Sequence, residues 1–148
     1  MNYFEDFCVG DEWTFPSWSI KEEDAFAFAT EYDPQPIHLD KELASQTHFG
    51  RPIVSGWQTL LKSIRYFVDG VMKDTAGLAS PGVDEIRWVR PVLPNEIITS
   101  GARVTEIKES ESRPDRGLVW FEVFANNSAG EQVLSSVGVF FIAKKPQD

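Results

Sequence analysis

The amino-acid sequence predicts an α+β fold in which an antiparallel β-sheet wraps around one long central helix. Residues 56–72 carry apolar side chains at helical spacing along their whole length. Four apolar segments with strand character follow, separated by short turns. The chain has 148 residues, which suits one domain, residues 1–148, with a substantial core. A helix that fills the apolar face of such a sheet is a stable packing of these elements.

The N-terminal part predicts a strand followed by a helix. Residues 12–18 are typical of an opening strand, which Pro16 weakens. Ser19 and Glu22 have the spacing of a capping box, so a helix is expected to begin there. Its apolar face is formed by Ala25, Phe28, Ala29 and Tyr32.

Two prolines end this first helix. Pro34 and Pro36 disfavour helical backbone, so we expect residues 33–39 to follow an extended or turn-like path. A second short helix is expected over about residues 41–46. Ser55 is the expected N-cap of the central helix. The apolar stripe of that helix comprises Trp57, Leu60, Leu61, Ile64, Phe67, Val68 and Val71.

The second half predicts a loop and then strands. Residues 73–82 are expected to form the loop, and strands are expected over 83–92, 97–107, 118–125 and 133–143. Asn95 tolerates a left-handed backbone in the turn after the first of these strands. Residues 126–130 have the composition of a hairpin turn.

Composition excludes several classes of protein. A net charge of −9 without clustered Lys and Arg argues against a nucleic-acid partner. No apolar run approaches the roughly 20 residues of a membrane span, so no membrane association is expected. Residues 1–10 lack the basic and apolar regions of a signal peptide. Together with the single cysteine, Cys8, these features predict a cytoplasmic protein.

Residues 33–40 contain the strongest chemical signal. Asp33 and His38 lie five residues apart on a segment that Pro34 and Pro36 stiffen. A carboxylate and an imidazole held near one another can exchange protons with the same substrate at neutral pH. Gly56, expected in the first turn of the central helix, has a backbone N–H without an intrahelical partner. The helix dipole adds positive charge there, so this amide is a natural oxyanion donor.

These segments resemble the MaoC-like family, which includes the (R)-specific enoyl-CoA hydratases. The family pattern has an Asp, a proline and a His two residues after that proline, here Asp33, Pro36 and His38. It continues through an F-x-R-P-I-V-x-G stretch, which reads here as residues 49–56. Residues 90–96 look like a later turn of the same family. The resemblance covers most of the chain.

The resemblance implies a hot-dog fold and a homodimer with the substrate tunnel at or near the subunit interface. It implies an acyl-CoA substrate and reversible hydration of a trans-2-enoyl-CoA to a 3-hydroxyacyl-CoA, with no metal and no cofactor. Asp33 and His38 match the catalytic pair, and Gly56 matches the oxyanion amide. Ser55, Tyr32 and Trp57 flank these positions and are candidates for the substrate-binding wall.

The chain departs from the family pattern at two positions. Tyr32 and Gln35 stand where Gly and Asn are frequent, which indicates a reshaped pocket. The helix serine that assists in some hydratases has no clear equivalent, although Ser63 is near the expected place. Arg51 is interpreted as a surface charge or as the partner of a carboxylate that fixes its loop. Arg87, Arg90 and Lys62 are either solvated charges or attractors of CoA phosphates.

Two other functions are compatible with this fold. A hot-dog thioesterase would direct water at the thioester carbonyl rather than the β-carbon, and the Asp33/His38 motif argues against it. A non-catalytic acyl-CoA binding or regulatory module is the second alternative, because fold does not fix function. An intact acid/base pair is hard to explain in such a module.

Overall fold

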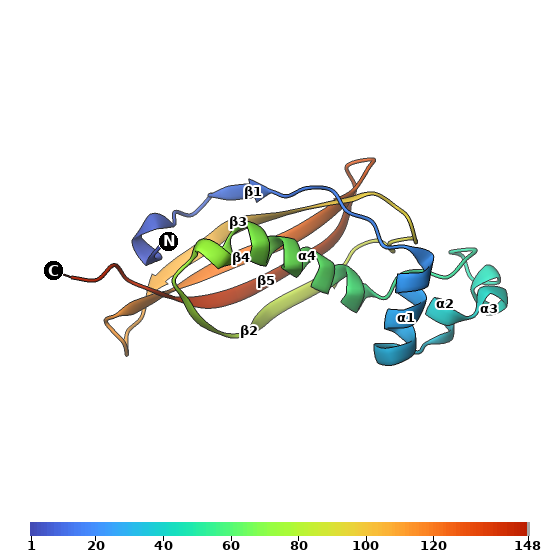
Figure 1. Ribbon diagram of the computed structural model, residues 1–148, viewed down its shortest axis with the longest axis horizontal. Coiled ribbons are helices and arrows are strands. Elements are labelled where there is room, and N and C mark those ends of the chain that lie inside the picture. The colour runs from blue at the N-terminus through green and yellow to red at the C-terminus, as the bar shows by residue number, and fades with distance from the viewer. Residues whose placement is uncertain (148) are drawn as a thin grey trace.

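A five-stranded antiparallel sheet is the largest element of the computed structural model, which describes residues 1–147 (Figure 1). The strand order is β1-β3-β4-β5-β2. The strands are β1 (Glu12–Thr14), β2 (Gly77–Trp88), β3 (Ile98–Glu109), β4 (Arg116–Asn127) and β5 (Gln132–Ala143). The helices are η1 (Phe4–Asp6), α1 (Glu22–Tyr32), α2 (Pro36–Leu39), α3 (Lys41–Ser45), α4 (Gly56–Gly70) and η2 (Met72–Asp74).

The central helix α4 lies across one face of the sheet, so the predicted α+β arrangement is confirmed (Figure 1). Phe67 of α4 is fully buried against the sheet, with its ring 5.1 Å from the ring of Phe121 and 5.6 Å from that of Phe140. The middle strand of the sheet, β4, follows the period of two that a one-sided sheet requires. Among residues 1–147, no helix has the length and apolar character that crossing a bilayer requires.

The buried face of α4 differs from the predicted stripe. Trp57 and Leu61 are half exposed, whereas Thr59 and Ser63 are buried. The hydroxyl of Ser63 donates to the Thr59 carbonyl at 2.9 Å and accepts from Ser100 of β3 at 3.1 Å. These bonds satisfy the polar groups that face the sheet. Polar residues can therefore lie on the buried face of a helix, although apolar periodicity alone predicts that they are exposed.

Strand β2 also differs from the prediction. It begins at Gly77, inside the segment expected to be a loop, and it ends at Trp88. It pairs with β5, so β4 and β5 separate it from β3. The turn at Asn95, which has the expected positive φ of 67°, thus joins strands that are not neighbours. Three shifts of register along β2 explain why its sequence lacks a regular alternation.

Helices α1, α2 and α3 form a lobe beyond one end of the sheet, next to the start of α4 (Figure 1). The predicted capping box does not form, because Lys21 is the N-cap of α1 and has no side-chain hydrogen bond. The opening strand ends at Thr14, four residues earlier than expected. Residues 36–39 are helical rather than extended, since Pro36 occupies the first helical turn, where a missing N–H costs nothing.

Candidate active site

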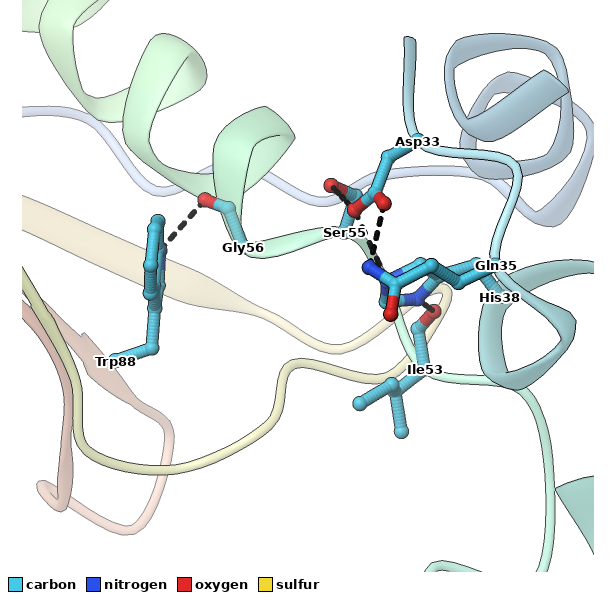
Figure 2. Close-up of polar contacts among 7 residues, drawn as sticks. All are labelled: Asp33, Gln35, His38, Ile53, Ser55, Gly56 and Trp88. Carbon is cyan, nitrogen blue, oxygen red and sulfur yellow. Dashed lines mark hydrogen bonds and ion pairs between the residues drawn. The ribbon is translucent and has the colours of Figure 1, made fainter.

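Asp33 and His38 come together at the junction of the lobe and α4 (Figure 2). Asp33 is the C-cap of α1, and His38 lies in the short helix α2 that follows. His38 Nε2 lies 3.1 Å from Asp33 Oδ2. The His38 side chain is only 8% exposed, and that of Asp33 is 13% exposed. The proline-stiffened segment therefore places a carboxylate and an imidazole in direct contact and almost out of solvent.

The other ring nitrogen of His38 fixes the position of one proton. Nδ1 lies 2.8 Å from the carbonyl oxygen of Ile53, and a carbonyl can only accept, so Nδ1 carries a hydrogen (Figure 2). The contact between Nε2 and Asp33 Oδ2 then requires a second proton between them, because two lone pairs would repel. The pair is either an imidazolium with a carboxylate or an imidazole with a carboxylic acid.

The surroundings of Asp33 favour the carboxylate. Burial raises the pKa of Asp33, but hydrogen bonds from Gln35 and Ser55 and the charge of His38 outweigh it and leave the pKa below its ordinary value. Gln35 Nε2 donates to Oδ1 at 2.6 Å, and Ser55 Oγ donates to Oδ2 at 2.7 Å. These three neighbours use three of the four acceptor sites of a carboxylate, which leaves one free.

Gly56 opens α4 beside this pair, and Trp88 covers it (Figure 2). The Gly56 N–H belongs to the first turn and has no acceptor within the helix. The Trp88 indole donates from Nε1 to the Gly56 carbonyl at 2.8 Å. A Cβ at position 56 would lie 2.6 Å from this ring, so only glycine fits beneath the indole. Trp57 stands edge-on to Trp88 at 5.0 Å.

One cavity of about 540 Å³ connects these groups. Its polar lining includes Asp33, His38 and the start of α4 at Gly56. Much of the rest of its wall is apolar or aromatic and includes Phe49, Ile53, Val54, Trp57, Trp88, Val89, Pro91 and Val92. An apolar cavity with a few convergent polar groups is the usual form of a small-molecule site. The arrangement can hold an acyl group with its polar end at the acid/base pair.

The other residues singled out in the sequence occupy different places. Ser55 is fully buried and reaches Asp33 rather than capping α4 with its side chain. Tyr32 is 67% exposed, packs on Phe28 and is not part of the cavity wall. Ser63 is buried against the sheet and does not line the cavity either. Arg51 donates to a backbone carbonyl, that of Pro94, rather than to a carboxylate.

Sequence reasoning missed three contributors to the site. Gln35 was noted only as a departure from a pattern, although its spacing from Asp33 allows a direct hydrogen bond. Trp88 arrives from a distant strand, and no local signal indicates its contact with Gly56. His48, stacked on Phe49 at 3.9 Å, lines the cavity as well. Among residues 1–147, no group of three or more His, Cys, Asp and Glu side chains is arranged to hold a metal ion.

The fold and the cavity define a hot-dog protein with a largely buried Asp33–His38 pair beside the N-terminus of its central helix. The family model of the MaoC like domain matches residues 7–118. The chain therefore belongs to the MaoC-like domain family, and the predicted family and hot-dog fold are confirmed. The matched region covers 65% of one curated relative, the uncharacterized protein YdeM of Bacillus subtilis, and 36% of another, protein MaoC of Klebsiella aerogenes.

Solved structures agree with this assignment. A MaoC-like dehydratase from Rhodospirillum rubrum is 32% identical, with a TM-score of 0.90 over 99% of this chain and 100% of the other. A monoamine oxidase regulatory protein from Archaeoglobus fulgius is 28% identical, with a TM-score of 0.90 over 98% and 96%. An (R)-hydratase from A. caviae is 25% identical, with a TM-score of 0.68 over 96% and 99%. These similarities support a hydratase or dehydratase role.

Proposed function

We propose that this protein is a hydro-lyase that reversibly hydrates a trans-2-enoyl thioester, as its CoA ester, to the 3-hydroxyacyl thioester. The observation that carries the proposal is that Asp33, His38 and the first residue of α4, Gly56, line one and the same largely apolar cavity. The relatives named as a dehydratase and an (R)-hydratase support the same reaction type. The chemistry requires proton transfer and oxyanion stabilisation, which these protein groups supply without a metal or redox cofactor.

In the proposed mechanism Asp33 is the base and His38 is the acid. Asp33 is the carboxylate, and its remaining acceptor site takes a proton from water as the water oxygen attacks the β-carbon. His38 carries hydrogen on Nε2 and gives that proton to the α-carbon. Asp33 is then protonated and His38 is neutral. The free acceptor site is on Oδ1, because Ser55 and His38 both contact Oδ2. Return of this proton from the Asp33 carboxyl group to His38 Nε2, with a water molecule as carrier, restores the starting state. Dehydration follows the same path in reverse.

Gly56 stabilises the charge that develops between these steps. Attack at the β-carbon moves negative charge to the thioester oxygen, which forms an enolate. Gly56 lines the cavity and is the first residue of α4, so we expect its N–H and the positive end of the α4 dipole to stabilise this oxygen. One such donor typically contributes about 10²–10³ in rate.

Two substitutions test the assignment. Asp33→Asn and His38→Ala are expected to fold yet lose nearly all hydration of crotonyl-CoA, which is measured as loss of enoyl absorbance. Ser128→Ala, in the exposed turn after β4, is the control and should keep the activity of the unmodified protein. Turnover retained at the unmodified level by either site variant would refute the proposal.

The same assay separates the two alternative functions. Release of free thiol from crotonyl-CoA would indicate a thioesterase. Tight binding of CoA esters without turnover, over a range of chain lengths, would indicate a binding or regulatory module. Loss of enoyl absorbance without free thiol is the result expected of the hydro-lyase.

We also propose that the protein forms a homodimer through the free edge of β2. This edge has no strand partner within residues 1–147, and it exposes large apolar side chains at Leu78, Val83, Trp88 and Val89. Such an edge is a template for pairing with a second chain. Val83→Lys is expected to shift the sedimentation of the protein to that of a monomer, whereas Val9→Lys at an equally exposed position should not. A cytoplasmic location remains our prediction.

A further inference from the structure

A second cavity of about 500 Å³ adjoins the first on the side of the lobe. His38 and Ile53 line both cavities, so the two spaces share this part of their walls. The second cavity lies between the lobe and the turn before β3. Its lining is Glu22, Ala25, Phe26, His38, Leu39, Lys41, Gly50, Arg51, Pro52, Ile53, Pro94 and Asn95. It therefore combines apolar walls with charged groups from α1, α3 and the loop before α4.

The charged groups of the second cavity have a net positive sign. Lys41 forms an ion pair with Glu22 at 2.9 Å, and both side chains are largely exposed. Arg51 makes one long contact of 3.3 Å to the Pro94 carbonyl, and no carboxylate within residues 1–147 lies within ion-pair distance of it. Two cations thus face one carboxylate, in a protein whose overall charge is −9. A guanidinium free of a carboxylate partner is suited to bind a phosphate.

The first cavity differs in this respect. Its only arginine, Arg90, is paired with Glu131 at 3.1 Å. The surfaces of both cavities are mostly apolar, so the unpaired arginine is what distinguishes the second one. A thioester with its reacting carbons beside Asp33 has two ends of unlike chemistry. One end is an apolar acyl chain, and the other is a polar arm that ends in a phosphate. The charge distribution matches the acyl chain to the first cavity and the arm to the second.

We propose that the second cavity binds the phosphopantetheine arm of the substrate, with Arg51 and Lys41 as ligands of its phosphate. The inference rests on the proposed function for the choice of a thioester. It places the phosphate of the arm at Arg51 and Lys41 rather than at Arg87 or Lys62, neither of which lines either cavity. Phe26 and Leu39 would contact the apolar part of the arm. CoA and an acyl-carrier protein share this arm, so both are candidate carriers.

The experiment compares crotonyl thioesters that differ only in the arm. KM is measured for crotonyl-pantetheine and for crotonyl-phosphopantetheine, with the unmodified protein, Arg51→Gln and Lys41→Gln. The preference for the phosphorylated ester is the ratio of the two KM values, and it is expected to fall about tenfold in Arg51→Gln, as loss of one charge-assisted hydrogen bond would give. Lys108→Gln, near the opposite end of the sheet, makes the same change in net charge and should leave the ratio unchanged.

The outcomes separate this inference from the proposed function. An unchanged ratio in both Arg51→Gln and Lys41→Gln would overturn it, even if hydration is confirmed. KM is then measured for crotonyl-CoA and for crotonyl-acyl-carrier protein. A higher KM for either substrate in Arg51→Gln supports the site and identifies the carrier. Calorimetry with free CoA provides a readout without turnover. Binding of CoA that Arg51→Gln weakens would support the site even if no thioester is hydrated.

Discussion

Removal of the Ser55 hydroxyl tests whether the charge of Asp33 is held by its hydrogen bonds. Ser55 is fully buried, and its Oγ lies 2.7 Å from Asp33 Oδ2. A hydrogen bond to a charged group contributes about 1.5–3 kcal/mol, and loss of the donor leaves a poorly solvated acceptor. Ser55→Ala is therefore expected to lower the free energy of unfolding by about this amount at neutral pH. Urea denaturation of the variant and the unmodified protein measures the difference.

The pH dependence of this difference distinguishes charge from packing. The pKa of Asp33 is lowered in the folded protein, so the stability that its ionisation contributes is present above the ordinary value of 3.8 and is lost as pH falls through the lower folded value. Ser55→Ala raises the folded pKa toward the ordinary one. The stability gap between the two proteins should therefore narrow as the pH falls below 3.8.

Two results would refute the reasoning about Ser55. A stability gap that is the same at neutral and acidic pH would show that Ser55 acts through packing alone. An equal loss from Ser55→Ala in the Asp33→Asn background would show that the hydroxyl does not act through the carboxylate, since a double-mutant cycle measures the coupling of the two groups. We also expect the acidic limb of kcat/KM to move toward higher pH in Ser55→Ala, because the base is then protonated more readily.

Two further substitutions test the packing around the site. Gly56→Ala would place a methyl group 2.6 Å from the Trp88 ring. It should therefore displace the indole, lower the free energy of unfolding by about 1–3 kcal/mol and reduce hydration activity. Adding Trp88→Ala should recover stability, and failure to recover it would show that the ring is not the obstacle. Ser100→Ala removes the acceptor of the buried Trp18 indole N–H, a 2.8 Å bond, and should cost about 1–3 kcal/mol in urea denaturation. A loss below that range would indicate that Trp18 finds another acceptor.

Local sequence signals predicted the elements that local physics controls. The bounds of α4 and β5 follow closely from helical spacing and from a continuous apolar run, and the left-handed Asn95 follows from its turn. The early strand begins at Glu12 as predicted but ends at Thr14, because its pairing with β3 ends there. The capping box at Ser19 was predicted wrongly, because the helix begins later, after Lys21. The edge position of β2 could not be predicted, since the local sequence does not determine that β2 pairs with β5 rather than with β3.

The acid/base pair was predictable for a different reason than its environment. Five residues separate Asp33 from His38, so the segment itself determines that they can meet. The donors that set the charge of Asp33 include Ser55, and the acceptor that fixes the tautomer of His38 is a backbone carbonyl at Ile53. Both belong to the entry of α4, and only the folded chain brings them to the lobe. Local sequence thus predicts the reacting groups, whereas tertiary structure sets their protonation.

The contacts that set the chemistry also attach the lobe to the rest of the protein. Ile53 N–H donates to the Ile37 carbonyl at 3.2 Å, beside the bond from His38 to the Ile53 carbonyl and the bond from Ser55 to Asp33. The lobe makes few close contacts with the sheet itself, because α1, α2 and α3 pack mainly on one another. A displacement of the lobe would therefore separate Asp33 from Ser55 and His38 from the Ile53 carbonyl together. Docking of the lobe and the hydrogen bonds of the Asp33–His38 pair to Ser55 and Ile53 therefore depend on the same contacts.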